Sequence, residues 1–235
     1  MSTAANSIKE KQMKIDNKVK EIANLKRRCF VTDGIISPED YLNSKKKILW
    51  LGREPHDNCS YDYKQDINKK LVEGNLKGSR YFNPMRYILF SSENGYIRSS
   101  KIIKLAQRSS SDTNEKITNL LKKVAFINCS KITGKSAIKD WNKWERNCEL
   151  FKGIVAEQIK IADPDVIICL GTLQYLNENG YLDGYEILKK SYRNYYKKDK
   201  KLIIDCYHLS FWGITQAKYI NDIISVLKKE YETGY

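Results

Sequence analysis

Polar side chains follow short apolar runs in this sequence, and they are of types that can move protons or form hydrogen bonds. The run ILWL is followed by a segment that holds Glu54, His56 and Asp57. Asn128 follows the run VAFI, and His208 follows LIIDCY. The chain has only two histidines, so the position of both after apolar runs is informative. A carboxylate, an imidazole and an amide that meet can activate water, stabilise developing charge and read a hydrogen-bonding edge.

These residues need elements that bring them together, and the apolar runs supply them. Each run is almost wholly apolar, which is typical of central strands of a parallel sheet: Ile48–Leu51, Val124–Ile127, Val166–Leu170 and Leu202–Ile204. Helical patterns over 144–162 and 215–229 lie between or after them. The alternation predicts an α/β fold, a three-layer αβα arrangement around a mainly parallel four-stranded sheet. Ligands bind at the carboxyl ends of strands in such sheets, so the polar residues should share one edge.

The remainder of the chain predicts two further features. Residues 7–28 have apolar residues at helical spacing, so we expect an N-terminal helical extension over 1–40 and one α/β domain over 41–235. Residues 91–118 are polar and rich in serine, which predicts an inserted segment or loop around a short helix.

Composition narrows the class of protein. The 235 residues are 41% hydrophobic, enough for one sizeable core, and the formal net charge of +14 favours a polyanionic partner. Nucleic acid is the first candidate and an anionic membrane surface the second, while solubility alone is the alternative. No apolar run approaches the ~20 residues of a membrane span, and the N-terminus has no signal-peptide core. Six scattered cysteines without a C-x-x-C pair predict reduced thiols and no metal site. We therefore expect a cytoplasmic monomer that binds nucleic acid and no membrane.

Three short motifs occur in an informative order. GREPH (Gly52–His56), FIN (Phe126–Asn128) and HLS (His208–Ser210) resemble the motifs of the uracil-DNA glycosylase superfamily, such as GQDPY, a middle strand ending in Asn, and HPS. PDVIICLGT (Pro164–Thr172) is similar to the strand that precedes the last of these motifs. The resemblance covers about residues 45–230. It implies a monofunctional DNA glycosylase that hydrolyses the N-glycosidic bond of a flipped base, leaves an abasic site and uses no metal or cofactor.

The sequence also departs from the superfamily patterns. Glu54 stands where the GQDPY branch has Asp, and Leu209 replaces the Pro of HPS. His56 occupies the position of the Tyr that excludes a 5-methyl group in the uracil-restricted branch. The cysteine quartet of the iron–sulfur branches has no counterpart. The expected substrates therefore include uracil and modified pyrimidines, among them 5-substituted bases of phage type, in either DNA repair or antiviral defence.

The resemblance implies catalytic roles. Glu54 would hold the attacking water and offset positive charge at C1′, with Asp57 as the second choice. His208 would donate a hydrogen bond to the O2 atom of the departing base. The alternatives are structural: Glu54 as a solvated or helix-capping carboxylate, and His208 bonded to backbone at a strand end.

The base would be held by other residues. Asn128 would read its edge, and an Asn amide pairs with uracil in one orientation and with a cytosine-like edge in the other. Tyr81 or Phe82 resembles the aromatic residue that stacks on the flipped base, and His56 lies where the 5-position is read. An Asx turn at Asn128 and core packing of the aromatic residues are the alternatives.

DNA contacts are predicted in two segments. Phe211 and Trp212 follow HLS, where a wedge residue enters the duplex in the superfamily, and Ser210 would contact a phosphate. The segment 189–201 alternates basic and aromatic residues, which suits phosphate contacts and stacking, or else a solvated hairpin. Its DNA-binding candidates are Lys189, Lys190, Arg193, Tyr195, Lys197 and Lys198.

Two other functions are compatible with the same residues. One is a catalytically inactive nucleic-acid-binding protein on this fold, a sensor or an inhibitor. The other is an enzyme that acts on free nucleotides, against which the positive charge counts.

Overall fold

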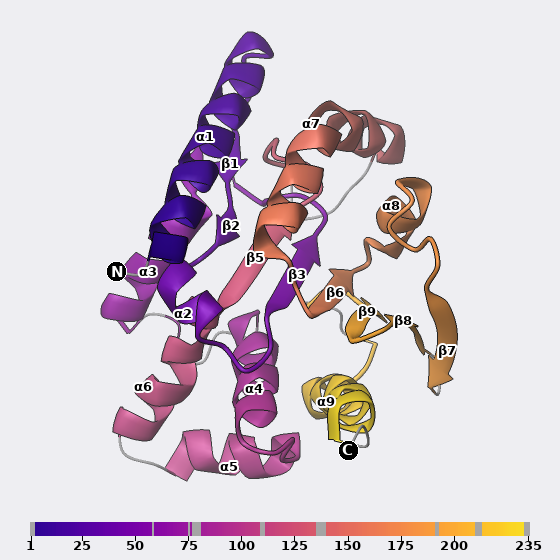
Figure 1. The fold of residues 1–235 in the computed structure, drawn as a ribbon. Helices are drawn as coiled ribbons and strands as arrows, with labels where there is room; N and C mark the ends of the chain where they lie inside the picture. The colour runs from indigo at the N-terminus through magenta and orange to yellow at the C-terminus, as the bar shows by residue number, and fades with distance from the viewer. Residues whose placement is uncertain are drawn as a thin grey trace.

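A mixed β-sheet with helices packed on both faces organises the protein, as the computed structural model shows (Figure 1). The structure describes residues 3–57, 59–74, 76, 81–108, 111–134, 140–190, 193–209 and 213–232. The sheet has the strand order β2-β5-β3-β6-β9-β8-β7, and β1 and β4 form a separate parallel pair. The strands are β1 (Val31–Thr32), β2 (Gly34–Ile35), β3 (Ile48–Gly52), β4 (Tyr61–Asp62), β5 (Val124–Asn128), β6 (Val166–Leu170), β7 (Glu186–Lys190), β8 (Arg193–Lys198) and β9 (Lys201–Cys206).

The four apolar runs form the parallel centre of this sheet, β5-β3-β6-β9. Trp50 of β3 lies opposite Phe126 on one side and Ile168 on the other. The α/β class and the mainly parallel sheet are thus as predicted, but the prediction of four strands is wrong. The antiparallel β2 extends one edge, and the antiparallel β8 and β7 extend the other. The sequence did not reveal them because β2 is two residues long and β7 and β8 are rich in polar residues.

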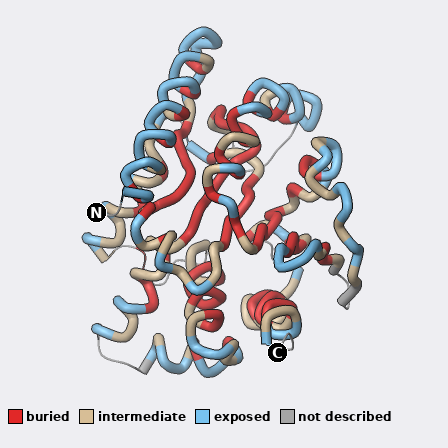
Figure 2. The backbone as a smooth tube through the Cα atoms, in the orientation of Figure 1, coloured by how far each residue is buried: buried red, intermediate tan, exposed pale blue. Residues whose placement is uncertain are grey.

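Helices cover both faces of the sheet. Ile48 and Trp50 of β3 pack into one core with α4 and α9, and Leu49 and Leu51 pack into another with α7 and α8. Figure 2 shows the buried strands running between the helices. None of the described helices has the length and apolar character that a membrane span needs. The helices are α1 (Thr3–Leu25), α2 (Pro38–Leu42), α3 (Tyr63–Val72), α4 (Phe82–Glu93), α5 (Ser99–Arg108), α6 (Ser111–Asn119), α7 (Trp141–Ala162), α8 (Leu173–Glu178) and α9 (Gln216–Glu232), with a 3₁₀ turn at Leu120–Lys123.

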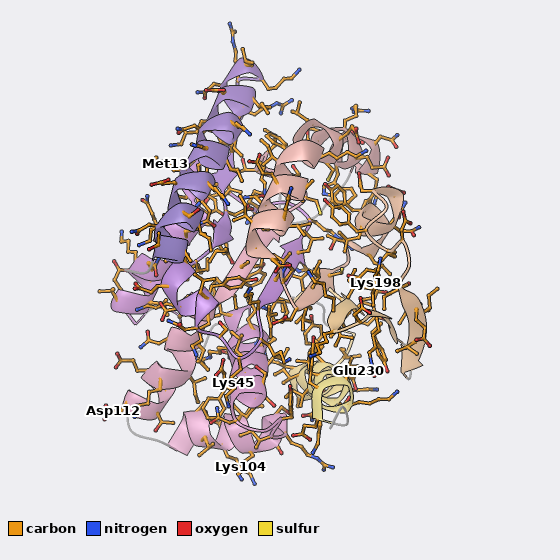
Figure 3. All side chains as sticks on the ribbon, viewed as in Figure 1. Met13, Lys45, Lys104, Asp112, Lys198 and Glu230 are labelled. Carbon is orange, nitrogen blue, oxygen red and sulfur yellow. The ribbon has the colours of Figure 1, made fainter. Side chains whose placement is uncertain are left out.

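The N-terminal helix α1 packs against the α/β domain. Ile15 and Val19 are buried in a cluster with Phe151 and Ile154 of α7, whereas Met13 on the outer face is 59% exposed (Figure 3). The side chain of Gln12 is buried and pairs with the backbone of β2. Residues 1–40, predicted as an extension, therefore contribute both a packed helix and an edge strand to the same body.

The serine-rich segment 91–118 is more ordered than the expected loop. It contains the whole of helix α5 and all but the last residue of α6. The backbone N–H of Ser99 donates to Asn221 of α9 at 2.9 Å, and Ile102 is fully buried. The prediction of a loop around one short helix is therefore wrong, because the apolar residues of α5 pack against α4 and α9.

The contact between α1 and β2 gives a test of how far the N-terminal helix stabilises the fold. The backbone N–H of Ile35 donates to Gln12 Oε1 at 2.6 Å, and Gln12 Nε2 donates to the carbonyl of Ile35 at 3.3 Å. We expect Gln12→Ala to lower the free energy of unfolding by about 1–3 kcal/mol, because it leaves a buried N–H without its acceptor. Urea denaturation measures the change.

Gln174→Ala is the matched control, since Gln174 is exposed and its hydrogen bond among the described residues stays within α8, to Glu178. Its expected change is within about 0.5 kcal/mol. Equal effects of the two substitutions would show that α1 adds no stability through this contact.

Candidate active site

A cavity of about 460 Å³ lies where the central strands end. Gly52 at the end of β3 is opposite Asn128 at the end of β5, and His208 follows β9. The cavity is lined by all the residues predicted to act in catalysis or base binding: Glu54, His56, Asp57, Tyr81, Phe82, Asn128 and His208. The structure thus brings together residues from segments up to about 150 positions apart in the sequence.

Aromatic rings form one wall of this cavity. Tyr63 stacks on Phe126 with ring centroids 4.7 Å apart and an interplanar angle of 19°. Tyr81 meets Phe82 edge-on at 5.1 Å and lies 5.8 Å from the His208 ring. Burial raises the pKa of Tyr63 and of Tyr81, so both phenols stay neutral. The wall is therefore a flat, uncharged surface of the kind on which a planar ring stacks.

The carboxylate of Glu54 lines the cavity and lies against the loop that follows β5. Gly134 of that loop donates its backbone N–H to the carbonyl of Pro55 at 2.8 Å. A Cβ atom on Gly134 would collide with the Glu54 carboxylate, so a larger residue at this position would displace that carboxylate. Burial raises the pKa of Glu54, while the charges of Lys143 and Arg53 oppose the rise. Partial removal from water strengthens the interaction of this carboxylate with any charge that forms beside it.

Arg53, directly after β3, acts electrostatically on the imidazole of His208. The sequence patterns predicted no role for it. Its Nε donates to the carbonyl of Gly171 at 3.1 Å, and its guanidinium lies 5.0 Å from the ring centroid of Trp141. Burial, and then the charge of Arg53, lower the pKa of His208. At neutral pH His208 is therefore a neutral imidazole, with one N–H donor and one acceptor nitrogen.

Asn128 is almost fully buried, with 3% of its surface exposed. Its backbone N–H and its Nδ2 both donate to Oδ2 of Asp33, at 2.8 and 3.0 Å. A Cβ atom on Gly52 would approach the Oδ1 of Asn128 to 2.6 Å, so the glycine leaves room beside the amide. Asp33 lies between β1 and β2 and belongs to none of the sequence motifs, so its contact with Asn128 was not predicted.

In comparisons with known proteins, no family model matches the chain, and no curated protein matches it. Within the described residues, no three His, Cys, Asp or Glu side chains gather as a metal site. The chemistry of this protein is therefore inferred from the cavity and its residues.

The structure contradicts the stacking role predicted for Tyr195, whereas DNA contact by Lys197 and Lys198 stays a prediction. Tyr195 is 1% exposed and donates its hydroxyl hydrogen bond to Glu230 at 3.0 Å, so its ring is unavailable for stacking. Lys197 pairs with the same glutamate at 2.8 Å. β8 is antiparallel to β9, with Lys198 opposite Lys201, so both lysines lie near the end of the sheet away from the cavity. Figure 3 shows Lys198 and Glu230 on the side of the β8 hairpin and α9.

The other DNA-contact candidates are placed less completely. Lys190 pairs with Arg193 where β7 meets β8, and Lys189 precedes them, so their backbone lies at the same edge of the sheet as the end of β9. Ser210, Phe211 and Trp212 lie outside the described residues. Trp141 at the start of α7 is 49% exposed next to Arg53. This tryptophan was not among the residues predicted from the sequence, where its signal is an aromatic residue directly after two charged ones, Lys139 and Asp140.

The effect of Arg53 on His208 is testable by titration. We expect His208 to titrate below its ordinary value of 6.5. Arg53→Gln should raise the pKa of His208, because the substitution removes a neighbouring positive charge. NMR of the imidazole hydrogens measures the pKa of His208 in the native protein and in Arg53→Gln. His56→Gln assigns the two histidine signals.

Arg146→Gln is the control, since Arg146 is exposed on α7 and lines a different cavity. An unchanged His208 pKa in Arg53→Gln would contradict the coupling.

Proposed function

We propose that this protein is a DNA glycosylase of the uracil-DNA glycosylase type, which hydrolyses the N-glycosidic bond of a flipped pyrimidine. One observation carries the proposal. A single cavity unites a half-buried carboxylate, a buried amide and a neutral imidazole beside stacked aromatic rings. Its volume of about 460 Å³ is within the range of ligand sites, roughly 300–1,000 Å³. Those groups meet the demands of a base that must be stacked, read at its edge and released as an anion.

Glu54 supports the first half of the reaction. Cleavage of the C1′–N bond builds positive charge on the sugar, which a nearby carboxylate offsets while it orients the attacking water. Asp57 is less suited because it is exposed, and its Oδ1 already accepts from the backbone N–H and the thiol of Cys59, both at 3.4 Å. Glu54 is the more enclosed of the two, and its interaction with developing charge is correspondingly stronger.

His208 supports the second half. The departing base becomes an anion, and a neutral imidazole can donate its N–H to the base oxygen that gains charge. The lowered pKa of His208 keeps it in this neutral donor form at pH 7. Asn128 lines the same cavity and presents its amide to the base edge.

The substrate class follows from the remaining lining and from charge. His56 lines the cavity and is exposed, so a substituent at the 5-position of a pyrimidine would have room to extend towards solvent beside it. The net charge of +14 and the exposed Trp141 favour a polynucleotide over a free nucleotide. A flipped base costs a few kcal/mol to unstack, roughly, which these contacts would offset.

Excision is tested with labelled oligonucleotides that each carry one candidate base. The panel is uracil, thymine opposite guanine, 5-hydroxymethylcytosine and its glucosylated form, and alkali reveals the abasic sites. We expect one class of base to be excised, and Glu54→Gln to lower the rate by about 10²–10⁴-fold, because it removes the carboxylate that acts in the transition state.

Glu149→Gln is the control, since its side chain is 73% exposed on α7, and it should keep the full rate. A Glu54→Ala/His208→Ala variant that cuts as fast as the native protein would overturn the assignment. DNA binding without excision of any base would favour the inactive nucleic-acid-binding protein instead.

DNA binding itself gives a second measurement. If lysines and arginines neutralise several phosphates, the logarithm of the binding constant should fall linearly with the logarithm of salt concentration. The expected slope has a magnitude of about 0.9 for each phosphate neutralised in duplex DNA. Fluorescence anisotropy between 50 and 200 mM salt, roughly the range over which such contacts weaken, measures it. A flat salt dependence would indicate an enzyme of free nucleotides.

A further inference from the structure

We propose that Asp33 is a positioning residue that gives the cavity its base selectivity by holding the Asn128 amide in one orientation. The inference deepens the proposed glycosylase function, because it assumes that Asn128 reads the base. Asp33 itself does not line the cavity. It acts through Asn128, to which it is hydrogen bonded.

The hydrogen bonds leave the amide one stable orientation. Oδ2 of Asp33 accepts from the backbone N–H of Asn128 and from its Nδ2. Rotation of the amide by 180° would bring the carbonyl Oδ1 against the carboxylate, where two acceptors would meet without a proton between them. Both residues are buried, at 3% and 1% exposure, so no bulk water would compensate.

Asp33 cannot turn to release the amide, because its other oxygen is also occupied. Oδ1 of Asp33 pairs with Nζ of Lys131 and accepts from Nε2 of Gln158 at 3.1 Å. Gln158 donates to the backbone carbonyl of Asp33 as well, at 2.9 Å. The orientation of Asn128 is thus set by groups from the β1–β2 segment, the loop after β5 and α7.

A fixed amide has a chemical consequence for base recognition. Pyrimidines with a protonated N3 and a 4-oxo group present a donor and then an acceptor, whereas 4-amino pyrimidines present the reverse at the same two atoms. A freely rotating Asn amide pairs with both patterns. An amide held with Nδ2 on Asp33 and Oδ1 beside Gly52 matches only one of them for a given position of the base. An unmatched polar pair in a buried site costs about 10-fold or more in rate.

The test compares the excision rates of two substrate bases that differ only in this pattern. One comparison is uracil against cytosine, and the other is 5-hydroxymethyluracil against 5-hydroxymethylcytosine. The variant is Asp33→Asn with Lys131→Met, which preserves side-chain volume and leaves no buried charge unpaired. We expect the native protein to prefer one member of each pair by about 10-fold or more. In the variant the ratio of the two rates should fall towards unity, because an Asn at position 33 accepts either orientation of Asn128.

Asp16→Asn is the matched control. Asp16 also pairs with a lysine, Lys64, at 3.1 Å and is largely buried, but none of the described hydrogen bonds joins it to Asn128. A purely structural role for Asp33 would lower both rates and leave their ratio unchanged, as we expect of Asp16→Asn. An unchanged ratio in the Asp33 variant, or equal rates in the native protein, would overturn the proposal.

Gly52→Ala is a second variant that leaves the Asp33–Lys131 pair intact. Its Cβ would meet Oδ1 of Asn128 at 2.6 Å and displace the amide from the opposite side. The rate ratio should fall here too, even where the Asp33 variant folds poorly.

A measurement without catalysis separates this proposal from the proposed function. NMR measures how fast the side-chain amide hydrogens of Asn128 exchange with solvent, and Asn128→Ser assigns their signals. This hydrogen exchange should be slow in the native protein and in Asp16→Asn. In the Asp33 variant it should be at least about 10-fold faster, because the charged acceptor is lost. If no base is excised but the exchange rates differ in this way, the glycosylase proposal fails while the positioning role stands. Equal exchange rates would overturn the positioning role.

Discussion

The ion pair between Asp33 and Lys131 is the interaction on which the site most depends. Both side chains are fully inaccessible to water. Removing two such charges from water costs several kcal/mol per ion, roughly, unless every remaining hydrogen-bonding position is filled. Burial accordingly lowers the pKa of Lys131, and Asp33 opposes that change. Asn128 and Gln158 supply the further donors that the carboxylate needs. These contacts join the N-terminal segment to the edge of the sheet that carries the cavity.

Local sequence patterns predicted the centre of the sheet but not its edges. Residues such as Trp50 and Ile168 lie in runs that are apolar at every position, because both faces of a central parallel strand are covered. An edge strand carries no such signal. β2 is a strand because Gln12, 23 positions earlier, bonds its backbone and because β5 offers a free edge to Gly34. Those are tertiary contacts, which no window of sequence contains.

The residues of the site also divide into those that local sequence signals predict and those that tertiary contacts alone place there. Glu54, Asn128 and His208 could be found because each follows a strand signal, and strand ends meet at one edge. Asp33 is 95 positions from Asn128 and belongs to no recognisable pattern. Tyr195 shows the opposite error. Its basic neighbours suggested an exposed platform, but the alternation of a strand turns its side chain into the core beneath α9, where Lys229 and Glu230 meet its hydroxyl.

Charge is used in two physically different ways in this protein. The excess of lysine and arginine gives a long-range field at the surface, which salt screens within about 8–10 Å. Lys131 does not add to that field, because Asp33 neutralises its charge in the protein interior. Dissolved ions do not reach this pair and so do not screen it. If the protein is the glycosylase proposed above, its attraction to DNA would weaken with salt, while the orientation of Asn128 would not. Affinity for the polymer and discrimination between bases would then depend on separate sets of residues, and each could change without the other.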